Sequence, residues 1–551
     1  MIWQNHNRSD LPRSQMSGRP GQRKWESSPG SNCLPLDIAA RVPIFIVKSK
    51  PRISSLKGDL DMNLKSLHQS LLFAVCLLLI SVTALHAEQK ISADRPNIVF
   101  ILIDDMGWPD PVSYGNQFHD TPHIDQLASD GVRFTDFYAA CPVCSPTRAS
   151  IQAGQYQARL HLTDFIPGHW RPFEKLIVPE NAPHLPLEIV TPGELLQSAN
   201  YNTAYFGKWH LGPESHNPDQ QGYQTSLVTG GRHFAPRFRT TPSTRIPNKA
   251  YLADFLTDKT IEFIRQNKSK PFFVQLSHYA VHIPLEAKQQ MIRKYQQKPK
   301  PAYGINNPVY AAMVAHVDDS VGRIVAALEE LKLTENTVVI FTSDNGGLRQ
   351  SFSGGDIVST NAPLRDEKGS LYEGGIRVPL IIKWPGVAAA GKTCAEPTIS
   401  IDFWPTFAEI AHTTLQEHQT IDGLSLLPLL KDPSSHLNRE EIYFHYPHYH
   451  HSTPASAIRA GDWKLIEFFA DGNLELYNLQ QDLSETTNLA AKNPEKAVEL
   501  QQKLADWRTR TGAALPVKNP KYDPARASEF WNRRTNQPVP ERRKTRIDQT
   551  N

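Results

Sequence analysis

A cysteine stands where a helix is expected to begin, in the segment Cys144-Ser145-Pro146-Thr147-Arg148. Proline is well tolerated in the first turn, because it loses no hydrogen bond there, and Gly154 could end the helix. The free N–H groups and the dipole at a helix N-terminus favour an anion. A thiol in that position is usually a nucleophile or is converted into one. Spacing alone leaves an ordinary helix start that happens to contain a cysteine equally open.

Four oxygen-bearing side chains directly follow two segments of strand length: Asp104, Asp105, Asp344 and Asn345. Residues 97–103 form an apolar run that suits a strand buried on both faces, and residues 337–343 are expected to form the next buried strand. Ligands of open α/β sheets bind beyond the carboxyl ends of strands. A hard divalent cation would relieve the repulsion between adjacent carboxylates. For the aspartate pair alone, an acidic turn in water is the simpler explanation.

Three further segments carry groups that could handle protons or negative charge. Lys208 and His210 lie two residues apart, so on an extended segment they share one face. Such a pair suits an anionic group that also exchanges protons. His278 and His282 follow a strand expected over residues 271–277, which makes them acid–base candidates. A surface lysine and structural histidines would be the commoner explanations of these residues taken singly.

The motifs together resemble those of the type I sulfatases, which belong to the alkaline phosphatase superfamily. Residues 144–148, followed by residues 149–154, resemble the maturation motif of that family, and residues 207–212 resemble its second recurring motif. The resemblance continues at intervals from about Arg95 to about Ala490. Ile151-Gln152 stands where two leucines, or leucine and methionine, are commoner, and this departure puts no role in doubt.

This resemblance implies an arylsulfatase-like enzyme that hydrolyses sulfate esters to an alcohol and inorganic sulfate. It implies that a formylglycine-generating maturation enzyme oxidises Cys144 to Cα-formylglycine, whose hydrated aldehyde is the nucleophile. The implied catalytic residues are Cys144, Arg148, Lys208, His210, His282 and Lys368. The implied ligands of one Ca²⁺, or alternatively Mg²⁺, are Asp104, Asp105, Cys144, Asp344 and Asn345.

Each implied role is chemically coherent. The metal and the two lysines would stabilise charge on the sulfate oxygens. Arg148 would hold the hydrated aldehyde, and Asp344 would help to deprotonate its attacking hydroxyl. His282, with Lys368, would assist the leaving alcohol, and His210 would take the proton from the second hydroxyl. A plain serine or cysteine lacks that second hydroxyl.

The substrate is expected to be a sulfated carbohydrate rather than a small aryl sulfate, which is an argument from analogy. Long irregular stretches often select substrates in enzymes of this size, and here they cover residues 160–191 and 230–236. The candidates on them for gripping a sugar are Trp170, Arg171, Arg232 and His233, with solvated loop residues as the alternative. Two other functions remain open: a phosphonate or phosphate-ester hydrolase of the same superfamily, and an inactive protein that binds sulfated glycans.

Strands that alternate with helices predict an α/β fold with a large, mixed, mostly parallel sheet sandwiched by helices. Amphipathic or apolar spacing predicts helices over residues 251–266 and 308–333. Past Asp422, short strands over residues 457–466 and 474–479 and a helix over 493–507 predict a smaller antiparallel sheet with one helix. The expected domains are therefore a catalytic domain over 88–421, a C-terminal α+β subdomain over 422–512 and a tail rich in proline and charge over 513–551.

The N-terminus differs in composition from the rest of the chain. Residues 1–61 lack periodicity and are expected to be disordered or a spurious extension. Residues 62–87 resemble a secretory signal peptide, with an apolar core over 71–82 and cleavage near Ala87, so a secreted or periplasmic protein is expected. That core is too short for a stable membrane span. A lipoprotein attached through Cys76 is the alternative.

The totals exclude some classes of partner. The chain has 551 residues and a formal net charge of +3. No basic run lies on an aromatic-rich segment, so nucleic acid is not an expected partner. Five cysteines do not make a disulfide framework, although Cys141 and Cys394 could pair or remain buried thiols.

Overall fold

The computed structural model describes residues 95–168, 170–302, 304–350, 356–413, 418–532 and 536–538. The expected N-terminal extension and signal peptide, residues 1–87, and the end of the expected tail, residues 539–551, lie outside this part of the chain. Within it, no helix combines the length and the apolar character that a membrane crossing requires.

A nine-stranded sheet forms the centre of residues 95–421, the part expected to be catalytic and called the catalytic part below. Its strands are, in spatial order, β11 (Lys392–Cys394), β2 (Val132–Phe134), β10 (Leu380–Lys383), β9 (Thr337–Ser343), β1 (Asn97–Ile103), β8 (Phe272–Ser277), β5 (Asn202–Gly207), β6 (Thr225–Thr229) and β7 (Thr240–Thr241). Strands β9, β1, β8, β5 and β6 run parallel, whereas β10 and β7 are antiparallel to their neighbours. The expected mixed, mostly parallel sheet is confirmed.

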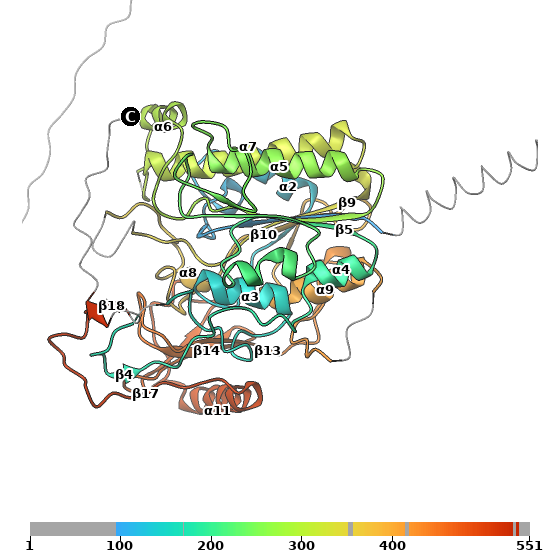
Figure 1. The fold of residues 1–551 in the computed structure, drawn as a ribbon. Coiled ribbons are helices and arrows are strands. Elements are labelled where there is room, and N and C mark those ends of the chain that lie inside the picture. The colour runs from blue at the N-terminus through green and yellow to red at the C-terminus, as the bar shows by residue number, and fades with distance from the viewer. Residues whose placement is uncertain are drawn as a thin grey trace, which may run out of the picture. The chain divides into compact units, whose positions relative to one another are not determined.

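Helices cover both faces of this sheet (Figure 1). One face carries α2 (Pro122–Asp130), α5 (Leu252–Asn267), α6 (Gln289–Gln297) and α7 (Pro308–Glu330). The other carries α3 (Cys144–Ala153), α4 (Pro192–Ser198), α8 (Glu373–Ile376), α9 (Phe403–Ile410) and α10 (Leu427–Lys431). Alternate residues of β1 serve the two cores, Val99 and Ile101 on the first face and Ile98 and Phe100 on the second. This burial on both faces explains the continuous apolar run in the sequence.

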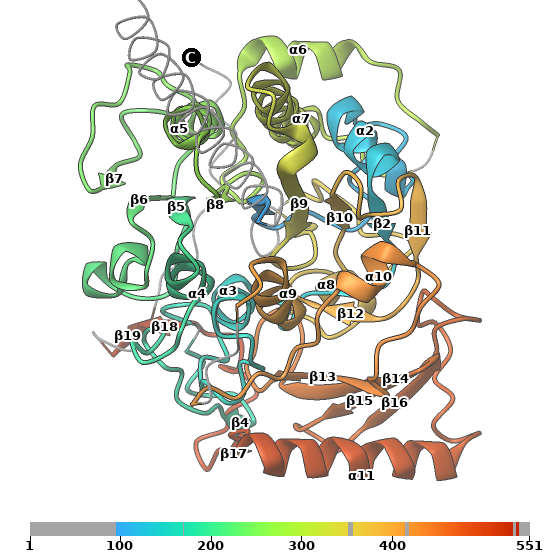
Figure 2. The same ribbon diagram turned by 90° about the vertical axis from the view of Figure 1, so that its right-hand side faces the viewer.

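The C-terminal subdomain is a four-stranded antiparallel sheet with one helix, as expected (Figure 2). Its strands are β13 (Glu441–Tyr446), β14 (Ala455–Ala460), β15 (Trp463–Phe468) and β16 (Leu474–Asn478), and α11 (Pro494–Thr511) packs on β14 and β15. The segment 457–466, expected to form short strands around turns, divides into β14 and β15 around Gly461. A small sheet of β3 (Phe137–Tyr138) and β12 (Thr398–Ile399) lies in the catalytic part.

Residues 513–532 of the expected tail pack back on the catalytic part. Strand β17 (Val517–Lys518) pairs with β4 (Leu176–Ile177), and the amide of Trp531 donates to the carbonyl of Trp170 at 2.8 Å. Trp531 begins β18 (Trp531–Asn532), which pairs with β19 (Gln537–Pro538). The first part of the tail therefore packs against the irregular stretch 160–191, which carries Trp170.

Candidate active site

Four neighbouring parallel strands bring the sequence motifs to one edge of the central sheet. The amide of Asp344, after β9, donates to the carbonyl of Ile103 in β1 at 3.0 Å. The amide of His278, after β8, donates to Leu102 in β1 at 2.9 Å, and the amide of Lys208, after β5, donates to Ser277 in β8 at 2.9 Å. The strand pairing thus continues into the loops and fixes their positions relative to one another. In Figure 1 this edge is on the left of the sheet.

The acidic residues after β1 and β9 form one buried cluster. The amide of Asp105 donates to Asp344 Oδ1 at 3.2 Å, and Asn345 Nδ2 donates to Asp105 Oδ1 at 2.8 Å. Asp105 has a φ of 64°, in the left-handed region, where aspartate is tolerated better than most residues. This turn, directly after β1, sends Asp104 and Asp105 to different neighbours.

Each carboxylate of the cluster pairs with a different basic side chain. Lys208 Nζ lies 2.6 Å from Asp104 Oδ2, and Lys368 Nζ lies 2.6 Å from Asp105 Oδ1. The third pair joins Arg148 to Asp344, with Nε and Nη2 at 2.8 and 2.7 Å from Oδ2. Buried charges are tolerated when they are paired in this way.

The pairing shifts the pKa values of these groups. Burial would raise the pKa of Asp105, but Lys368, with His282 and Lys208, outweighs burial and holds it well below the usual range. For Asp344, burial outweighs the effect of Arg148 and raises the pKa to about 6. Burial would lower the pKa of Lys368, but the carboxylate of Asp105 raises it above its ordinary value. Lys368 therefore stays charged over the physiological pH range.

Cys144 is the first residue of α3, as expected, and is buried there. Gly154 ends the helix with a φ of 65°, a left-handed C-cap. Cys144 Sγ lies 3.3 Å from Nδ1 of His210. Burial raises the pKa of this thiol, so an unmodified Cys144 would be a poor nucleophile at neutral pH.

The tautomer of His210 follows from its second contact. His210 Nε2 lies 2.6 Å from the carbonyl oxygen of Ile166. A carbonyl can only accept, so Nε2 carries the proton and Nδ1 presents a lone pair toward Cys144. Burial, reinforced by the charge of Lys208, holds the pKa of His210 well below its usual value. His210 is thus arranged to accept a proton from the side chain of residue 144.

Three buried oxygen atoms of the acidic cluster have no hydrogen-bond partner within the described part of the chain: Asp104 Oδ1, Asp105 Oδ2 and Asn345 Oδ1. Ligand atoms of Asp104, Cys144 and Asp344 also lie within 4.8 Å of one another. Unpaired buried oxygens are costly, and carboxylate and amide oxygens are the ligands that Ca²⁺ and Mg²⁺ prefer. The residues present therefore fit a hard divalent cation.

His282 lies at the partly open side of the cluster. Its Nδ1 donates to the carbonyl of Ile283 at 2.7 Å, and its Nε2 lies 3.6 Å from Asp105 Oδ2. Burial lowers the pKa of His282 to about 3, and Asp105 offsets only part of this effect. His278, the other histidine of this segment, is fully buried and bonds Ser320 of α7 at 2.9 Å, away from the acids. Only His282 of the two joins the site.

The four residues proposed to grip a sugar have different surroundings. His233 is buried, and its Nε2 donates to the carbonyl of His282 at 2.9 Å. The ring of His233 therefore fixes the backbone of His282. Burial of His233 also lowers its pKa to about 4. Contact of His233 with a sugar stays a prediction. Arg232 is exposed to solvent.

Trp170 and Arg171 belong to the region covered by the C-terminal tail. The rings of Trp170 and Trp531 lie 6.2 Å apart, edge to face. Arg171 Nη1 pairs with Glu174 at 3.3 Å, its Nη2 donates to the carbonyl of His450 at 3.2 Å, and its guanidinium lies over the ring of Phe530 at 4.3 Å. Contact of Trp170 or Arg171 with a substrate stays a prediction.

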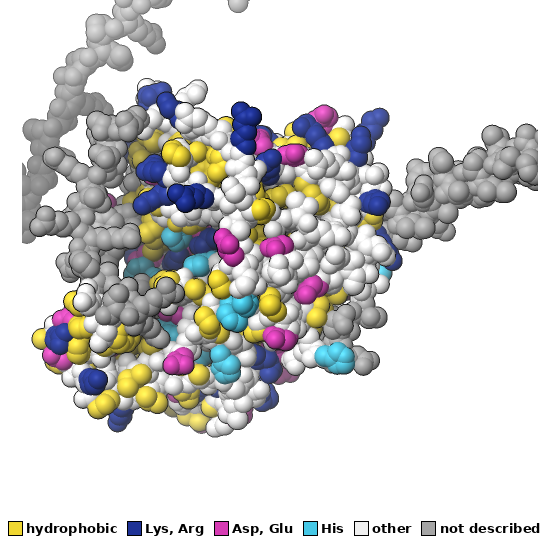
Figure 3. All heavy atoms as spheres, viewed as in Figure 1, with side chains coloured by type: hydrophobic (Ala, Val, Ile, Leu, Met, Phe, Trp, Pro, Cys, Tyr) yellow, Lys and Arg dark blue, Asp and Glu magenta, His cyan; other side chains and the backbone are white. Residues whose placement is uncertain are grey.

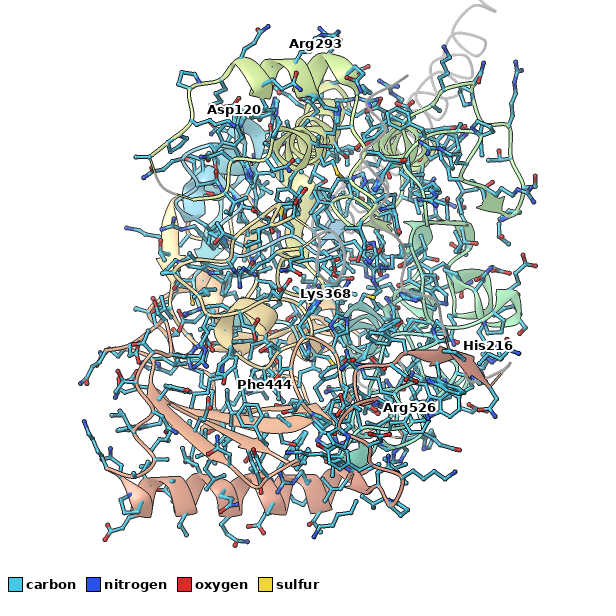
Figure 4. The ribbon with its side chains drawn as sticks, turned by 90° about the vertical axis from the view of Figure 1, so that its left-hand side faces the viewer. Asp120, His216, Arg293, Lys368, Phe444 and Arg526 are labelled. Atoms are coloured by element: carbon cyan, nitrogen blue, oxygen red, sulfur yellow. The ribbon has the colours of Figure 1, made fainter. Side chains whose placement is uncertain are left out.

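The loop between β13 and β14 contributes a residue that the sequence patterns did not single out. His451 Nδ1 lies 2.7 Å from the carbonyl oxygen of Lys368. In Figure 4, Lys368 lies near the middle of the view, between the catalytic part and the C-terminal sheet that carries Phe444. Figure 3 shows histidine and basic side chains gathered in a hollow on the left of that view. The four histidines among residues 445–451 are a signal in the sequence that could have directed attention to this loop.

The structure distinguishes between a Cys141–Cys394 disulfide and two buried thiols. Cys141, Cys144 and Cys394 are all buried thiols. Cys141 and Cys394 therefore do not pair in this structure. Burial raises the pKa of both thiols.

Comparison with known proteins gives matches over nearly all of the described chain. A model of the sulfatase family matches residues 96–413, and a model of the C-terminal part of N-sulphoglucosamine sulphohydrolase matches residues 366–510. A sulfatase of Formosa agariphila is 31% identical over 525 residues, which cover 80% of this chain and 94% of that protein.

Two solved structures are also similar over most of their length. The crystal structure of Ps i-CgsB in complex with k-i-k-neocarrahexaose is 28% identical, with a TM-score of 0.66 over 78% of this chain and 94% of that one. A second protein, solved with its substrate D-glucosamine-2-N,6-O-disulfate, is 25% identical, with a TM-score of 0.63 over 76% of this chain and 98% of that one.

Proposed function

The chain belongs to the sulfatase family and is a sulfuric ester hydrolase, and we propose that it uses an oxidised Cys144 and a divalent cation to cleave sulfated carbohydrates. One observation carries this proposal. Cys144 Sγ lies at a helix N-terminus, 3.3 Å from His210 Nδ1 and within 4.8 Å of ligand oxygens of Asp104 and Asp344. A side chain in that position would meet a metal and a proton acceptor together.

The sulfur of Cys144 stands in for the hydroxyls of a hydrated formylglycine. The hydrated aldehyde would supply two hydroxyls at this position, one to attack sulfur and one to allow release of sulfate. Arg148 is the residue that we propose to hold this group. Its guanidinium is fixed in place, because it donates to the carbonyl of Lys208 at 2.6 Å and to Asp344 Oδ2 at 2.8 Å. A formylglycine-generating enzyme would have to act on this cysteine.

The cation, for which we propose Ca²⁺ with Mg²⁺ as the alternative, would be held by Asp104, Asp105, Asp344 and Asn345. When bound, it would stabilise negative charge on the sulfate oxygens. The three unpartnered oxygens of Asp104, Asp105 and Asn345 support this assignment.

The proposed proton and charge carriers surround that point. Lys208 and Lys368, each fixed by an aspartate at 2.6 Å, would stabilise charge that develops on the sulfate group. His210 would accept the proton of the second hydroxyl at Nδ1. His282, partly exposed beside Asp105, would together with Lys368 assist departure of the alcohol.

A sulfated sugar is the proposed substrate class. The similarity to a protein solved with a glucosamine disulfate substrate, and to another solved with a neocarrahexaose, supports this choice over a small aryl sulfate. Export is a separate proposal, which rests on the apolar segment 71–82 and the small residue Ala87 after it. Cell fractionation with N-terminal sequencing would test it, and a retained residue 62 in an exported protein would contradict cleavage near Ala87.

The first test is the mass of the proteolytic peptide that spans Cys144, from protein made together with a maturation system. Conversion of cysteine to formylglycine removes one H and the SH group and adds one oxygen, so the peptide becomes lighter by roughly the mass of one water. Cys144→Ala is the matched control, because it should fold but show neither the mass change nor turnover. An intact thiol, although a control sulfatase matures in the same cells, would contradict the proposal.

Side-by-side turnover of an aryl sulfate and an aryl phosphodiester separates the remaining functions. Preference for the sulfate ester is expected from the matured enzyme. Faster turnover of the phosphodiester would favour a phosphonate or phosphate-ester hydrolase. Glycan binding without turnover by matured protein would favour an inactive binding protein.

A further inference from the structure

Lys368 is presented by a turn that the catalytic part holds through backbone contacts. The amide of Lys368 donates to Gly347 at 3.3 Å, and the amide of Gly369 donates to Pro142 at 2.8 Å. The amide of Ser370 closes the turn on Glu367 at 3.2 Å. These bonds leave the carbonyl of Lys368 itself to be satisfied from another element.

The loop between β13 and β14 supplies that partner. His451 Nδ1 lies 2.7 Å from the carbonyl oxygen of Lys368. Because a carbonyl only accepts, Nδ1 of His451 carries the proton and donates. The same nitrogen is 4.0 Å from Glu367 Oε2, so the carbonyl is the nearer acceptor. The contact joins the C-terminal subdomain to the residue that holds Asp105.

Gly369 shows how closely the loop and the turn approach each other. It has a φ of 83°, and a Cβ built there would lie 2.1 Å from Nδ1 of His450. No side chain would fit that gap, and the left-handed backbone favours glycine independently. Two consecutive histidines thus pack against two consecutive residues of the turn. A contact this close constrains where the Lys368 side chain starts.

We propose that His451 is a positioning residue for Lys368. By fixing the carbonyl of Lys368, it sets the backbone from which Nζ reaches Asp105 Oδ1 at 2.6 Å. The ring of His451 acts on Lys368 through the backbone of Lys368. The His451 side chain is 26% exposed. The proposal rests on the proposed role of Lys368 in stabilising sulfate charge. It makes the C-terminal subdomain part of the active-site geometry rather than an appendage.

Three variants of the full-length, matured protein test this role. His451→Ala is expected to lower kcat about tenfold with KM for an aryl sulfate changed less than about twofold, since small misplacements of a charge-stabilising group reduce the rate strongly. His451→Asn is expected to recover to within about threefold of the original kcat, because Asn Nδ2 occupies the position of His Nδ1. His436→Ala is the control, since this histidine of the same subdomain is 86% exposed and pairs with Glu396 rather than with a residue of the turn. A raised KM at unchanged kcat would overturn the proposal in favour of direct substrate contact.

A double-mutant cycle with Lys368→Ala asks whether His451 acts through Lys368. The double variant is expected to have the same kcat as Lys368→Ala alone, because the positioned group is already missing. Independent effects that multiply would overturn the proposal.

Hydrogen exchange of the peptide spanning residues 366–372 gives a reading that needs no activity. The amides of Lys368, Gly369 and Ser370 are expected to exchange several-fold faster in His451→Ala than in the original protein or in His436→Ala. Equal exchange in all three proteins would contradict the proposed stabilising contact between His451 and the carbonyl of Lys368. If the original protein cleaves no sulfate ester, this measurement still tests this contact, so failure of the proposed function and failure of this proposal remain distinguishable.

Discussion

Asp104 and Asp105 are neighbours in the chain, yet each pairs with a different lysine. Asp104 Oδ2 meets Lys208, which follows β5, and Asp105 Oδ1 meets Lys368, which precedes α8. The left-handed conformation of Asp105 turns the two carboxylates apart. Each aspartate keeps its second oxygen buried, and no residue that the structure describes forms a hydrogen bond to it. Two segments more than 150 residues apart thus complete the charge balance of one dipeptide.

Removal of divalent cations is expected to lower both activity and thermal stability. Without the cation, three oxygens buried among the described residues would lack a hydrogen-bond partner or a ligand. Chelation followed by dialysis should abolish turnover, and Ca²⁺ should restore turnover and raise Tm by mass action. Comparison of Ca²⁺ and Mg²⁺ in the same titration identifies the preferred ion.

Asn345→Ala tests the metal ligands without adding or removing a charge. Its loss of one amide oxygen is expected to weaken Ca²⁺ binding by about tenfold or more. Asn473→Ala is the control, because this asparagine is exposed on the C-terminal subdomain. Equal Ca²⁺ affinity in both variants would count against a site at Asn345.

His210→Ala is expected to uncouple the two halves of the reaction. Loss of the Nδ1 acceptor 3.3 Å from residue 144 removes the base for the second step but leaves the lysines in place. Rapid-quench assays should show about one equivalent of alcohol per enzyme in a burst, with sulfate release slowed by 10²-fold or more. Alcohol and sulfate released at equal, slowed rates would place His210 in the first step instead.

The stability of the protein should fall in mild acid, in part through His445. Burial, reinforced by Arg508, lowers the pKa of His445 to about 4 from its usual 6.5. Its contribution to stability is complete above pH 6.5. It is lost as the pH falls from 6.5 toward 4, because the unfolded chain then binds a proton that the folded chain does not.

His445→Gln is the variant that isolates this effect. It keeps a donor toward the carbonyl of Ala514, which His445 Nε2 contacts at 3.0 Å, but it cannot titrate. The slope of unfolding free energy between pH 6.5 and 4.5 should become shallower by about 1.4 kcal/mol per pH unit, the value for one proton. Urea unfolding at several pH values measures the slope. An unchanged slope would show that His445 does not contribute.

Lys464→Met should be strongly destabilising. Lys464 Nζ is fully buried and lies 2.8 Å from both Glu373 Oε1 and Glu485 Oε1, at the contact between α8 and the C-terminal sheet. Removal of the Lys464 ammonium leaves two buried carboxylates without their shared partner, which costs about 3–5 kcal/mol in folding free energy. Lys503→Met, which breaks the more exposed pair with Glu441, should cost about 1 kcal/mol or less. Similar losses in the two variants, measured by urea unfolding, would refute the argument.

Local patterns were sufficient to predict the elements that lie at the centre of the fold. Strands β1 and β9 begin and end at the predicted residues, because the apolar residues in the middle of each strand suit burial on both faces. Helix α7 begins at Pro308, as expected, and ends three residues before the predicted Leu333. The position of Cys144 at the start of α3 also followed from the residues around it.

Contacts between distant segments could not be read from such patterns. The direction of β10, antiparallel to β9, depends on the path of the chain and not on the apolar content of residues 380–383. The role of His233 behind His282 depends on a loop conformation that no periodicity records. The tether from His451 to Lys368 joins two loops, and the tail over Trp170 pairs strands of only two residues.

The burial of Cys144 has a consequence for how the enzyme is made. In the folded chain the thiol is only 2% exposed, and the whole of α3 around it is buried. On the proposed mechanism, an external oxidising enzyme can therefore reach this side chain only while the polypeptide is still extended. Folding and modification then compete in time, so a chain that folds faster, or in the absence of its modifying partner, would be trapped with an inert thiol. The yield of active protein would be decided during synthesis, before the native state exists.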